Sequence, residues 1–345
     1  MRKLTISLNL TAASLLLAAA TACSSAGAIP STLGMTPSAP QSAASQTAFD
    51  AHSHPAITSG TKLLYVADNT HNVILVFNQT NKTPKLKYKI TSGINKPAGI
   101  TTDLSGNLYV TNQFSGPSGG LGNLEIYKLG AKTPFETITT GMNGPMDVKV
   151  DNAGNIYVAN EPNEGTTRPW INFYPAGATE PSNTFYPPAD STPVLTGIAL
   201  VDPSEGGNTP IIATDFTDND GYFSGAVIQC AAQFGCSNLG YSFGQTGGLA
   251  VENPAGPYNA LDFLAVDKNI PGFDNIVLDQ KESQFSTGGV PQSLAFDSTR
   301  THLFVSNTGD VDEYSWPKMK KINTYSGNLG KALDWGVAVN PAGTF

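Results

Sequence analysis

The sequence is poor in charge, and above all in basic residues, and these two shortages exclude classes of protein. Charged residues make up 13% of the 345 positions, against roughly 25% in an average soluble domain, which excludes a coiled coil. Lysine and arginine number 19 against 27 aspartates and glutamates, a formal net charge of −8. A surface that neutralises phosphates is therefore not expected, and nucleic acid is excluded as a partner.

Turn-forming and apolar residues are abundant instead. The chain has 35 glycines and 24 prolines, which favour turns over long helices. Its hydrophobic content of 40% supplies enough apolar surface for a buried core, which excludes a disordered chain. The length is about twice that of a typical domain, although an all-β fold often reaches this size as one unit.

The first 22 residues indicate an export signal. A basic start is followed by an apolar stretch centred on Leu15–Ala20, and then by Ala22 and Cys23. This pattern resembles a lipoprotein signal peptide, in which the cysteine is lipidated and becomes the new N-terminus; an ordinary cleaved signal with an incidental cysteine is the alternative. The stretch is shorter than the roughly 20 residues that a membrane-spanning helix needs. We predict a signal peptide over residues 1–22 and a lipid on Cys23, which leaves 17 basic and 27 acidic residues.

Residues 23–59 are predicted to form a disordered tether. Serine, alanine, threonine and proline dominate this segment, and it cannot bury enough apolar surface to offset the entropy lost on folding. His52 and His54 could capture a metal ion, but we interpret them as a solvated pair in a linker. The folded domain is expected to span residues 60–345.

One sequence unit recurs six times in the predicted domain. It consists of an apolar strand, a turn that often combines Asp or Asn with Gly, and a second strand that ends in a small polar residue. Two further alternating strands follow it, and the units are 43–51 residues apart, which predicts four short antiparallel strands per repeat. The clearest copies are Pro97–Asn112 and Pro145–Asn160, and looser copies start at Gly197, Gly248, Ser293 and Gly336.

Two incomplete units are complementary. Val337–Asn340 matches a first strand without a second, and Leu63–Asp68 matches a second strand without a first. Pairing them in one sheet completes a repeat and removes the exposed sheet edges. The sequence therefore predicts an all-β fold, a six-bladed β-propeller whose ring is closed by pairing of C-terminal and N-terminal strands in one blade.

The second strands carry a family resemblance. Leu64–Asn69, Leu108–Asn112 and Ile156–Asn160 resemble segments of the NHL and YVTN families of bacterial propellers, and the resemblance extends over residues 63–345. It implies the propeller fold but no single activity, because these families include lyases, lactone hydrolases, and binders of carbohydrate or protein. A more distant resemblance to gluconolactonase-like propellers implies one divalent cation, held by acidic and amide side chains, that polarises a lactone carbonyl.

Each second strand ends in an aspartate or asparagine, and we call these six residues the strand-end ring. We expect their side chains near the mouth of the central channel, as candidates for ligand binding. Carboxylate and amide oxygens suit Ca²⁺ or Mg²⁺, so the three aspartates are also candidate metal ligands. The alternative is that the side chains hydrogen-bond backbone groups of the following turn. The ring consists of Asp68, Asn112, Asn160, Asp215, Asp267 and Asn307.

Patterns that identify a catalytic residue are not found. The gluconolactonase-like family needs an acidic ligand near the start of the propeller, and Asp68 is only a positional candidate for it. His71 and His302 are the only histidines of the predicted domain, which argues against the histidine-bound zinc of the amidating lyases. A nucleophile elbow, a phosphate loop and an ordered Ser-His-Asp set are missing. The catalytic residues therefore stay unknown.

Two further motifs lie in the repeat that starts at Gly197. Asp215–Gly221 resembles part of a calcium loop, but Phe216 stands where the template requires an acid, so we predict a polar hairpin loop. Cys230 and Cys236 are separated by five residues. In an exported protein this spacing favours a disulfide, whereas a redox pair prefers C-x-x-C.

Four aromatic residues fall in one repeat, beside an insertion at Glu161–Pro169. Aromatic faces in loops can stack on sugar rings or fill a pocket of a partner. Packing between blades explains some of these residues equally well. The four are Trp170, Phe173, Tyr174 and Tyr186.

The sequence favours a non-enzymatic role. It predicts a lipid-anchored, extracytoplasmic propeller of the bacterial envelope, on its periplasmic face or at the cell surface. This propeller is expected to act as a binding or scaffolding module for protein or carbohydrate. One alternative is a lactone or ester hydrolase that depends on a divalent metal, with Ca²⁺ or Mg²⁺ as its cofactor. The other is a structural envelope protein without a small-molecule ligand.

Overall fold

The computed structural model separates the chain into two units, residues 1–54 and 55–345. The predicted signal peptide, Cys23, His52 and His54 lie outside the described residues. Only the backbone is described for residues 194, 231 and 334–335, and for those parts of 211–224, 240–246 and 263–286 that the structure covers. The described residues are 60–79, 84–114, 120–161, 168–188, 194–201, 211–219, 222–231, 235–243, 246–251, 263–269, 273–278, 283–287, 289–326 and 334–342.

The described part of the chain forms 24 strands in six antiparallel sheets of four strands each. Within these residues, no helix is long and apolar enough to cross a membrane. Sheet 1 holds β24 (Asp334–Asn340), β1 (Leu63–Asp68), β2 (Val73–Asn78) and β3 (Lys85–Ile90). Sheet 2 holds β4 (Pro97–Thr102), β5 (Leu108–Asn112), β6 (Asn123–Tyr127) and β7 (Glu136–Ile138). Sheet 3 holds β8 (Pro145–Val150), β9 (Ile156–Asn160), β10 (Trp170–Tyr174) and β11 (Asn183–Phe185).

The remaining three sheets repeat this order. Sheet 4 holds β12 (Val194–Leu200), β13 (Ile211–Asn219), β14 (Tyr222–Ala231) and β15 (Gly235–Phe243). Sheet 5 holds β16 (Thr246–Val251), β17 (Phe263–Asn269), β18 (Phe273–Leu278) and β19 (Ser283–Ser286). Sheet 6 holds β20 (Pro291–Phe296), β21 (His302–Asn307), β22 (Asp310–Ser315) and β23 (Lys320–Tyr325).

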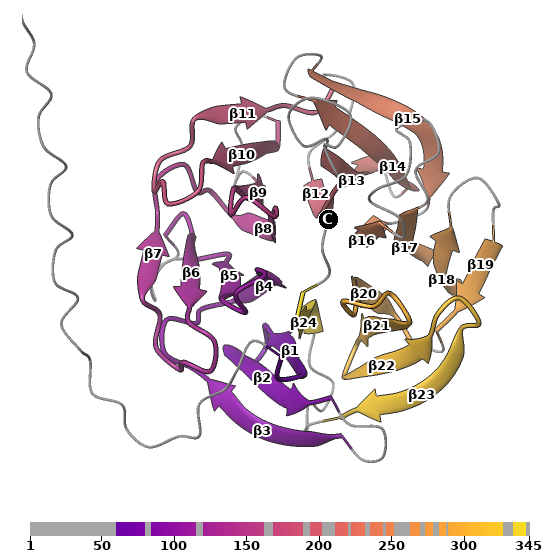
Figure 1. The fold of residues 1–345 in the computed structure, drawn as a ribbon. Helices are drawn as coiled ribbons and strands as arrows, with labels where there is room; N and C mark the ends of the chain where they lie inside the picture. Colours follow the sequence, from indigo (N-terminus) through magenta and orange to yellow (C-terminus); the bar gives the residue numbers. More distant parts are fainter. Residues whose placement is uncertain are drawn as a thin grey trace, which may run out of the picture. The chain divides into compact units, whose positions relative to one another are not determined.

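The sheets are arranged radially, with their first strands closest to a common centre (Figure 1). Each first strand contacts the first strands on both sides, in the circular order β24, β4, β8, β12, β16, β20. Sheet 1 joins the two ends of the folded region, because β24 pairs with β1 from Leu63↔Asn340 to Asp68↔Asp334. The prediction of an all-β propeller is confirmed.

Apolar faces of neighbouring sheets pack together and form the core. Between sheets 6 and 1, the ring of Tyr325 contacts Phe77 and Phe304, with centroids 5.7 and 6.1 Å apart. All three side chains are at most 2% exposed. Burying a side chain of this size contributes roughly 1.5–3 kcal/mol, so the junctions between sheets hold the ring together.

The predicted turns of Asp with Gly and Asn form between the first and second strands. The Asp103 carboxylate accepts the backbone N–H groups of Ser105 and Asn107 at 2.9 and 2.8 Å. Gly106 adopts φ +80°, which a glycine tolerates without steric cost. Asp151 repeats the arrangement in sheet 3, where it accepts the N–H groups of Ala153 and Asn155. The side chain of the aspartate therefore fixes each turn.

Sheet 4 differs from the expectation of a hairpin loop at Asp215–Gly221. Asp215–Asn219 belong to β13 and pair with β14, from Asp215↔Ala226 to Asn219↔Tyr222. The loop prediction is wrong for this part, because Phe216 and Thr217 suit a strand and the partner strand is long enough to pair with them. Residues 220 and 221 lie outside the described residues.

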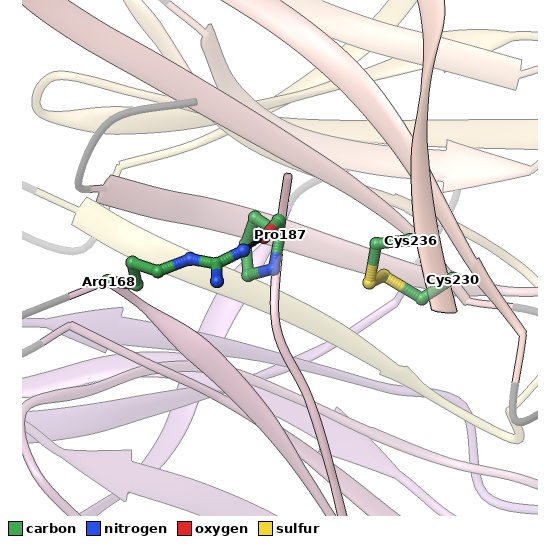
Figure 2. The surroundings of a disulfide bond; sticks show 4 residues. All are labelled: Arg168, Pro187, Cys230 and Cys236. Carbon is green, nitrogen blue, oxygen red and sulfur yellow. Dashed lines mark hydrogen bonds between the residues drawn. A yellow bond between two sulfur atoms is a disulfide. The ribbon is translucent and has the colours of Figure 1, made fainter. Parts of the chain in front are cut away.

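The predicted disulfide is confirmed. Cys230 at the end of β14 and Cys236 at the start of β15 are bonded, and they also face each other in the strand register. Figure 2 shows this bond together with Arg168, which donates to the Pro187 carbonyl oxygen. The bond joins the third and fourth strands of sheet 4 next to their connecting turn, so it acts locally.

Candidate ligand-binding site

The strand-end ring is buried where its side chains are described. Asp68, Asn112, Asn160 and Asn307 are each at most 3% exposed, and none of them lines the two channel cavities described below. They are covered because the second strand lies behind the first strand in every sheet. The backbone of Asp215 lies in β13 and that of Asp267 lies in β17, but their side chains are outside the described part.

Asn112 fastens the turn that leads into sheet 2. Its Oδ1 accepts the Asn95 N–H at 2.9 Å, and its Nδ2 donates to the Gly93 carbonyl and to Asn123 Oδ1, both at 2.7 Å. Asn160 does the same in sheet 3, where its Oδ1 accepts the Asn143 N–H at 3.0 Å. The bonded turn precedes the sheet, whereas the sequence suggested the turn that follows the strand.

The other two described members of the ring have different partners. Asp68 accepts the His71 N–H at 2.9 Å and contacts His71 Nδ1 at 2.7 Å, which is the following turn as expected. Asn307 donates to Asp310 Oδ1 at 3.1 Å. These contacts support the hydrogen-bonding interpretation of the ring, while its predicted role in ligand binding stays a prediction.

Histidines and acids do not gather into a metal site in the described part, where no group of three or more His, Cys, Asp or Glu side chains could hold an ion. His302 Nδ1 lies 3.1 Å from Asp297 Oδ2. Burial raises the pKa of Asp297, but hydrogen bonds from Thr299, His302 and Thr301 outweigh it, so this pKa is lowered overall. Asp297 thus takes the place of Asp103 and Asp151 in the turn of sheet 6.

The central channel is narrowed at one level by tight contacts between first strands. Every first strand has a register shift against its second strand at this level, which is the mark of a β-bulge. A Cβ added to Gly99 would lie 2.4 Å from the Asp147 Cα, and one added to Gly336 would lie 2.4 Å from the Ala98 carbonyl oxygen. We call this level the constriction. Its residues are Gly99, Asp147, Gly197, Gly248, Ser293 and Gly336.

Sheet 3 places an ion pair in this channel. The Lys149 ammonium lies 2.9 and 2.8 Å from the two carboxylate oxygens of Asp147. Oδ1 also accepts the Val148 N–H at 2.8 Å, and Oδ2 accepts the Ile198 N–H of sheet 4 at 2.9 Å. A buried carboxylate with this many donors is held rigidly. Asp147 therefore links two neighbouring sheets inside the channel.

The ion pair lies between two cavities. A cavity of about 90 Å³ is lined by the ends of the first strands, and Lys149 and Arg300 are its charged lining residues. A cavity of about 30 Å³ lies at the constriction and is lined by Asp147, Ser293 and Gln292 together with glycines of the first strands. Each is a small space, of a size for water, an ion or a small group rather than a large ligand.

The predicted aromatic group divides into buried and exposed members. Tyr174 is fully buried, its hydroxyl donates to the Thr140 carbonyl at 2.8 Å, and burial raises its pKa to about 12. Phe173 packs on Tyr157 with ring centroids 5.1 Å apart. Trp170 is half-buried, and Tyr186 is 53% exposed. Tyr186 is therefore the most exposed of the four, and Trp170 and Phe173 are both partly exposed.

Trp170 begins β10, and Tyr186 directly follows the last residue of β11. The register pairs Ile171 with Phe185, so its extension by one residue places Tyr186 opposite Trp170, on one face of the sheet. The Arg168 guanidinium lies 5.8 Å from the centroid of the Tyr186 ring. We call Arg168, Trp170 and Tyr186 the aromatic edge. It offers two aromatic faces and one cation to an approaching molecule.

The comparisons with known proteins agree with the fold. No protein-family model and no curated protein sequence matches the chain. A structure of a nidogen/laminin complex matches with a TM-score of 0.59 at 14% identity and covers 82% of this chain and 99% of that chain. A protein of unknown function from Desulfotomaculum acetoxidans gives a TM-score of 0.51 at 13% identity, over 82% and 99%. A candidate 6-phosphogluconolactonase from Bacteroides uniformis gives 0.53 at 10%, over 81% and 100%. Identities this low show the propeller fold alone.

Proposed function

We propose that this chain is a lipid-anchored, extracytoplasmic binding module, a closed six-bladed propeller that presents the aromatic edge to a protein or carbohydrate ligand. The observation that carries the proposal is the cross-strand position of Trp170 and Tyr186, which leaves large aromatic surface accessible beside a cation. Aromatic residues and arginine are the side chains that most often dominate binding surfaces.

The scaffold supports this role because its turns are held by side chains. Asn112 and Asn160 each bond the turn that enters their sheet, and the Tyr174 hydroxyl bonds the same turn as Asn160 through Thr140. A rigid platform loses little conformational entropy when it binds a ligand. The neighbours of known fold include a complex between two proteins, which is consistent with a propeller used as a binding module.

Binding to envelope polysaccharides and to envelope proteins is the direct test. Immobilised full-length protein is exposed separately to the polysaccharide fraction and to the protein fraction. For the fraction that binds, we expect Trp170→Ala and Tyr186→Ala to weaken binding about tenfold each, as the loss of an anchor residue of a binding surface does. Phe135→Ala is the matched control, because Phe135 is a second exposed aromatic ring with a cation, Lys128, 3.7 Å from its centroid. Wild-type binding by both edge variants would overturn the proposal.

The anchor is tested independently of the ligand. We expect Cys23→Ser to move the protein from the membrane fraction to the soluble extracytoplasmic fraction, because the only proposed membrane attachment is the lipid on that cysteine. Mass spectrometry of the membrane-bound wild type should show a lipid on Cys23. A membrane-bound protein whose N-terminus is unmodified and begins at a residue other than Cys23 would contradict the lipoprotein assignment.

A further inference from the structure

The constriction holds backbone N–H groups as well as small side chains. The residue after each constriction position pairs with an equivalent residue of the second strand in all six sheets. These pairs are Ile100↔Val110, Val148↔Val158, Ile198↔Ala213, Leu249↔Ala265, Leu294↔Val305 and Val337↔Val66. An antiparallel ladder with the same register directs equivalent N–H groups to the same side of the strand.

Two of these N–H groups reveal which side that is. The Val148 and Ile198 N–H groups donate to the Asp147 carboxylate, which lies at the constriction and lines its cavity. They therefore point away from the second strands and toward the channel. Because the register is shared, the N–H groups of Ile100, Leu249, Leu294 and Val337 point the same way.

In the part of the chain that the structure describes, no carboxylate is bonded to the other four donors. A Cβ on Gly336 would lie 2.9 Å from the Ile100 nitrogen, and a Cβ on Gly197 would lie 3.1 Å from the Leu249 nitrogen. The glycine of one first strand thus lies directly beside the N–H of the neighbouring first strand. In sheet 3, Asp147 takes the place of this glycine. A glycine has no side chain that could accept a hydrogen bond, so these donors face the channel space rather than a carboxylate of the protein.

We propose that the constriction binds a small monovalent anion, either a halide or the carboxylate of a small organic acid. Concave groups of backbone N–H donors bind anions, and the carboxylate of Asp147 already occupies two of the six donor positions as an internal anion. Lys149 neutralises Asp147 at 2.8 Å, so that carboxylate does not repel a second anion strongly. The residues of the other four donors line the cavity of about 90 Å³, together with Lys149 and Arg300, and this cavity accommodates an ion of this size.

Bromide is the probe for the wild-type protein. Crystals of the full chain grown in bromide are measured at the bromine absorption edge, and we expect one anomalous peak inside the ring formed by Ile100, Leu249, Leu294 and Val337. In solution, the ³⁵Cl NMR line should broaden with the protein and sharpen again when acetate competes. Absence of both the peak and the broadening would overturn the proposal. Broadening that acetate leaves unchanged would limit the site to halides.

Asp147→Gly gives sheet 3 the glycine that sheet 2 has at this position. It also frees two more donors, the N–H groups of Val148 and Ile198. We expect this variant to bind bromide about tenfold more tightly than the wild type, since hydrogen bonds to a charged group are the strong ones. Glu180→Gly is the control, because it removes the same charge at an exposed position. If Asp147→Gly fails to fold, Lys149→Met should weaken bromide binding instead, by restoring the charge of Asp147. Equal affinities in all folded variants would place the anion outside the constriction.

Discussion

Sheets 2 and 3 are near copies whose first strands differ in the charge that they carry. Both have an aspartate turn, Asp103 or Asp151, and both end the second strand in a buried asparagine that bonds the entering turn. Sheet 2 places Gly99 and Thr101 in the channel, where sheet 3 places Asp147 and Lys149. The shared residues build the blade, so the charge in the channel comes from Asp147 and Lys149, which sheet 2 does not repeat.

The largest effect is expected where the repeat requires a glycine. A Cβ at Gly99 would meet the Asp147 Cα at 2.4 Å, and backbone of the neighbouring sheet cannot move away cheaply. We expect Gly99→Ala to lower the free energy of unfolding by about 3 kcal/mol, the cost of overpacking a tight contact. Urea denaturation measures it. Gly60→Ala is the control, because a Cβ there meets nothing within 4 Å, and equal losses in both variants would contradict the constriction.

The strand-end asparagines test whether equivalent residues contribute equally. Asn112→Ala removes three hydrogen bonds of a side chain that is 1% exposed. We expect a loss of about 2–3 kcal/mol, the summed cost of three lost hydrogen bonds. Asn160→Ala removes two bonds, to Asn143 and Val158, and should cost less. A larger loss for Asn160 would show that bonds to the entering turn do not decide stability.

The fold could be predicted well because it depends on local patterns that repeat. Alternation within the strands, the aspartate turns and the complementary strands β1 and β24 all leave a signal in the sequence. Cys230 and Cys236 could be paired because the short spacing leaves few alternatives. These features need no knowledge of which side chains meet across the ring.

The candidate site was predicted less well because it depends on directions in space. The repeated polar residue Asn112 suggested a ring around the channel, but the second strand lies behind the first and the side chain points at the entering turn. The six repeated units do carry one acid, Asp147, at a position otherwise filled by glycine or serine. That exception was the available signal. The bulges that turn the N–H groups inward have no signature in residue type.

The third strands differ between the two sheets in a way that pH can detect. Glu125 in β6 takes the place of Asn172 in β10, and both accept a hydrogen bond from a threonine of the fourth strand, at 2.6 and 2.9 Å. Burial raises the pKa of Glu125, and hydrogen bonds from Thr137 and Asn123 only partly offset this. A raised carboxyl pKa means that stability is full below the ordinary pKa and is lost as pH rises through the folded-state value.

We therefore expect Glu125→Gln to remove this loss. Above the pKa of Glu125 the variant should be as stable as the wild type or more stable by at most about 1 kcal/mol, because it no longer buries a charge. At lower pH, where the wild-type side chain is protonated, the two proteins should unfold at the same urea concentration. Urea midpoints measured across the acidic range give the comparison. A variant that is less stable at neutral pH would mean that the ionised carboxylate is favoured by its bonds.

The smallest effect is expected at the turns, where the two sheets differ without consequence. Leu104 in sheet 2 stands where sheet 3 has Asn152, and Leu104 is 48% exposed. The turn is held by the carboxylate of Asp103 through the N–H groups of Ser105 and Asn107, so the residue between contributes little. Leu104→Asn should change the free energy of unfolding by less than about 0.5 kcal/mol, as exposed substitutions usually do. A clear loss in urea denaturation would instead reveal a contact of Leu104 that separates sheet 2 from its copy.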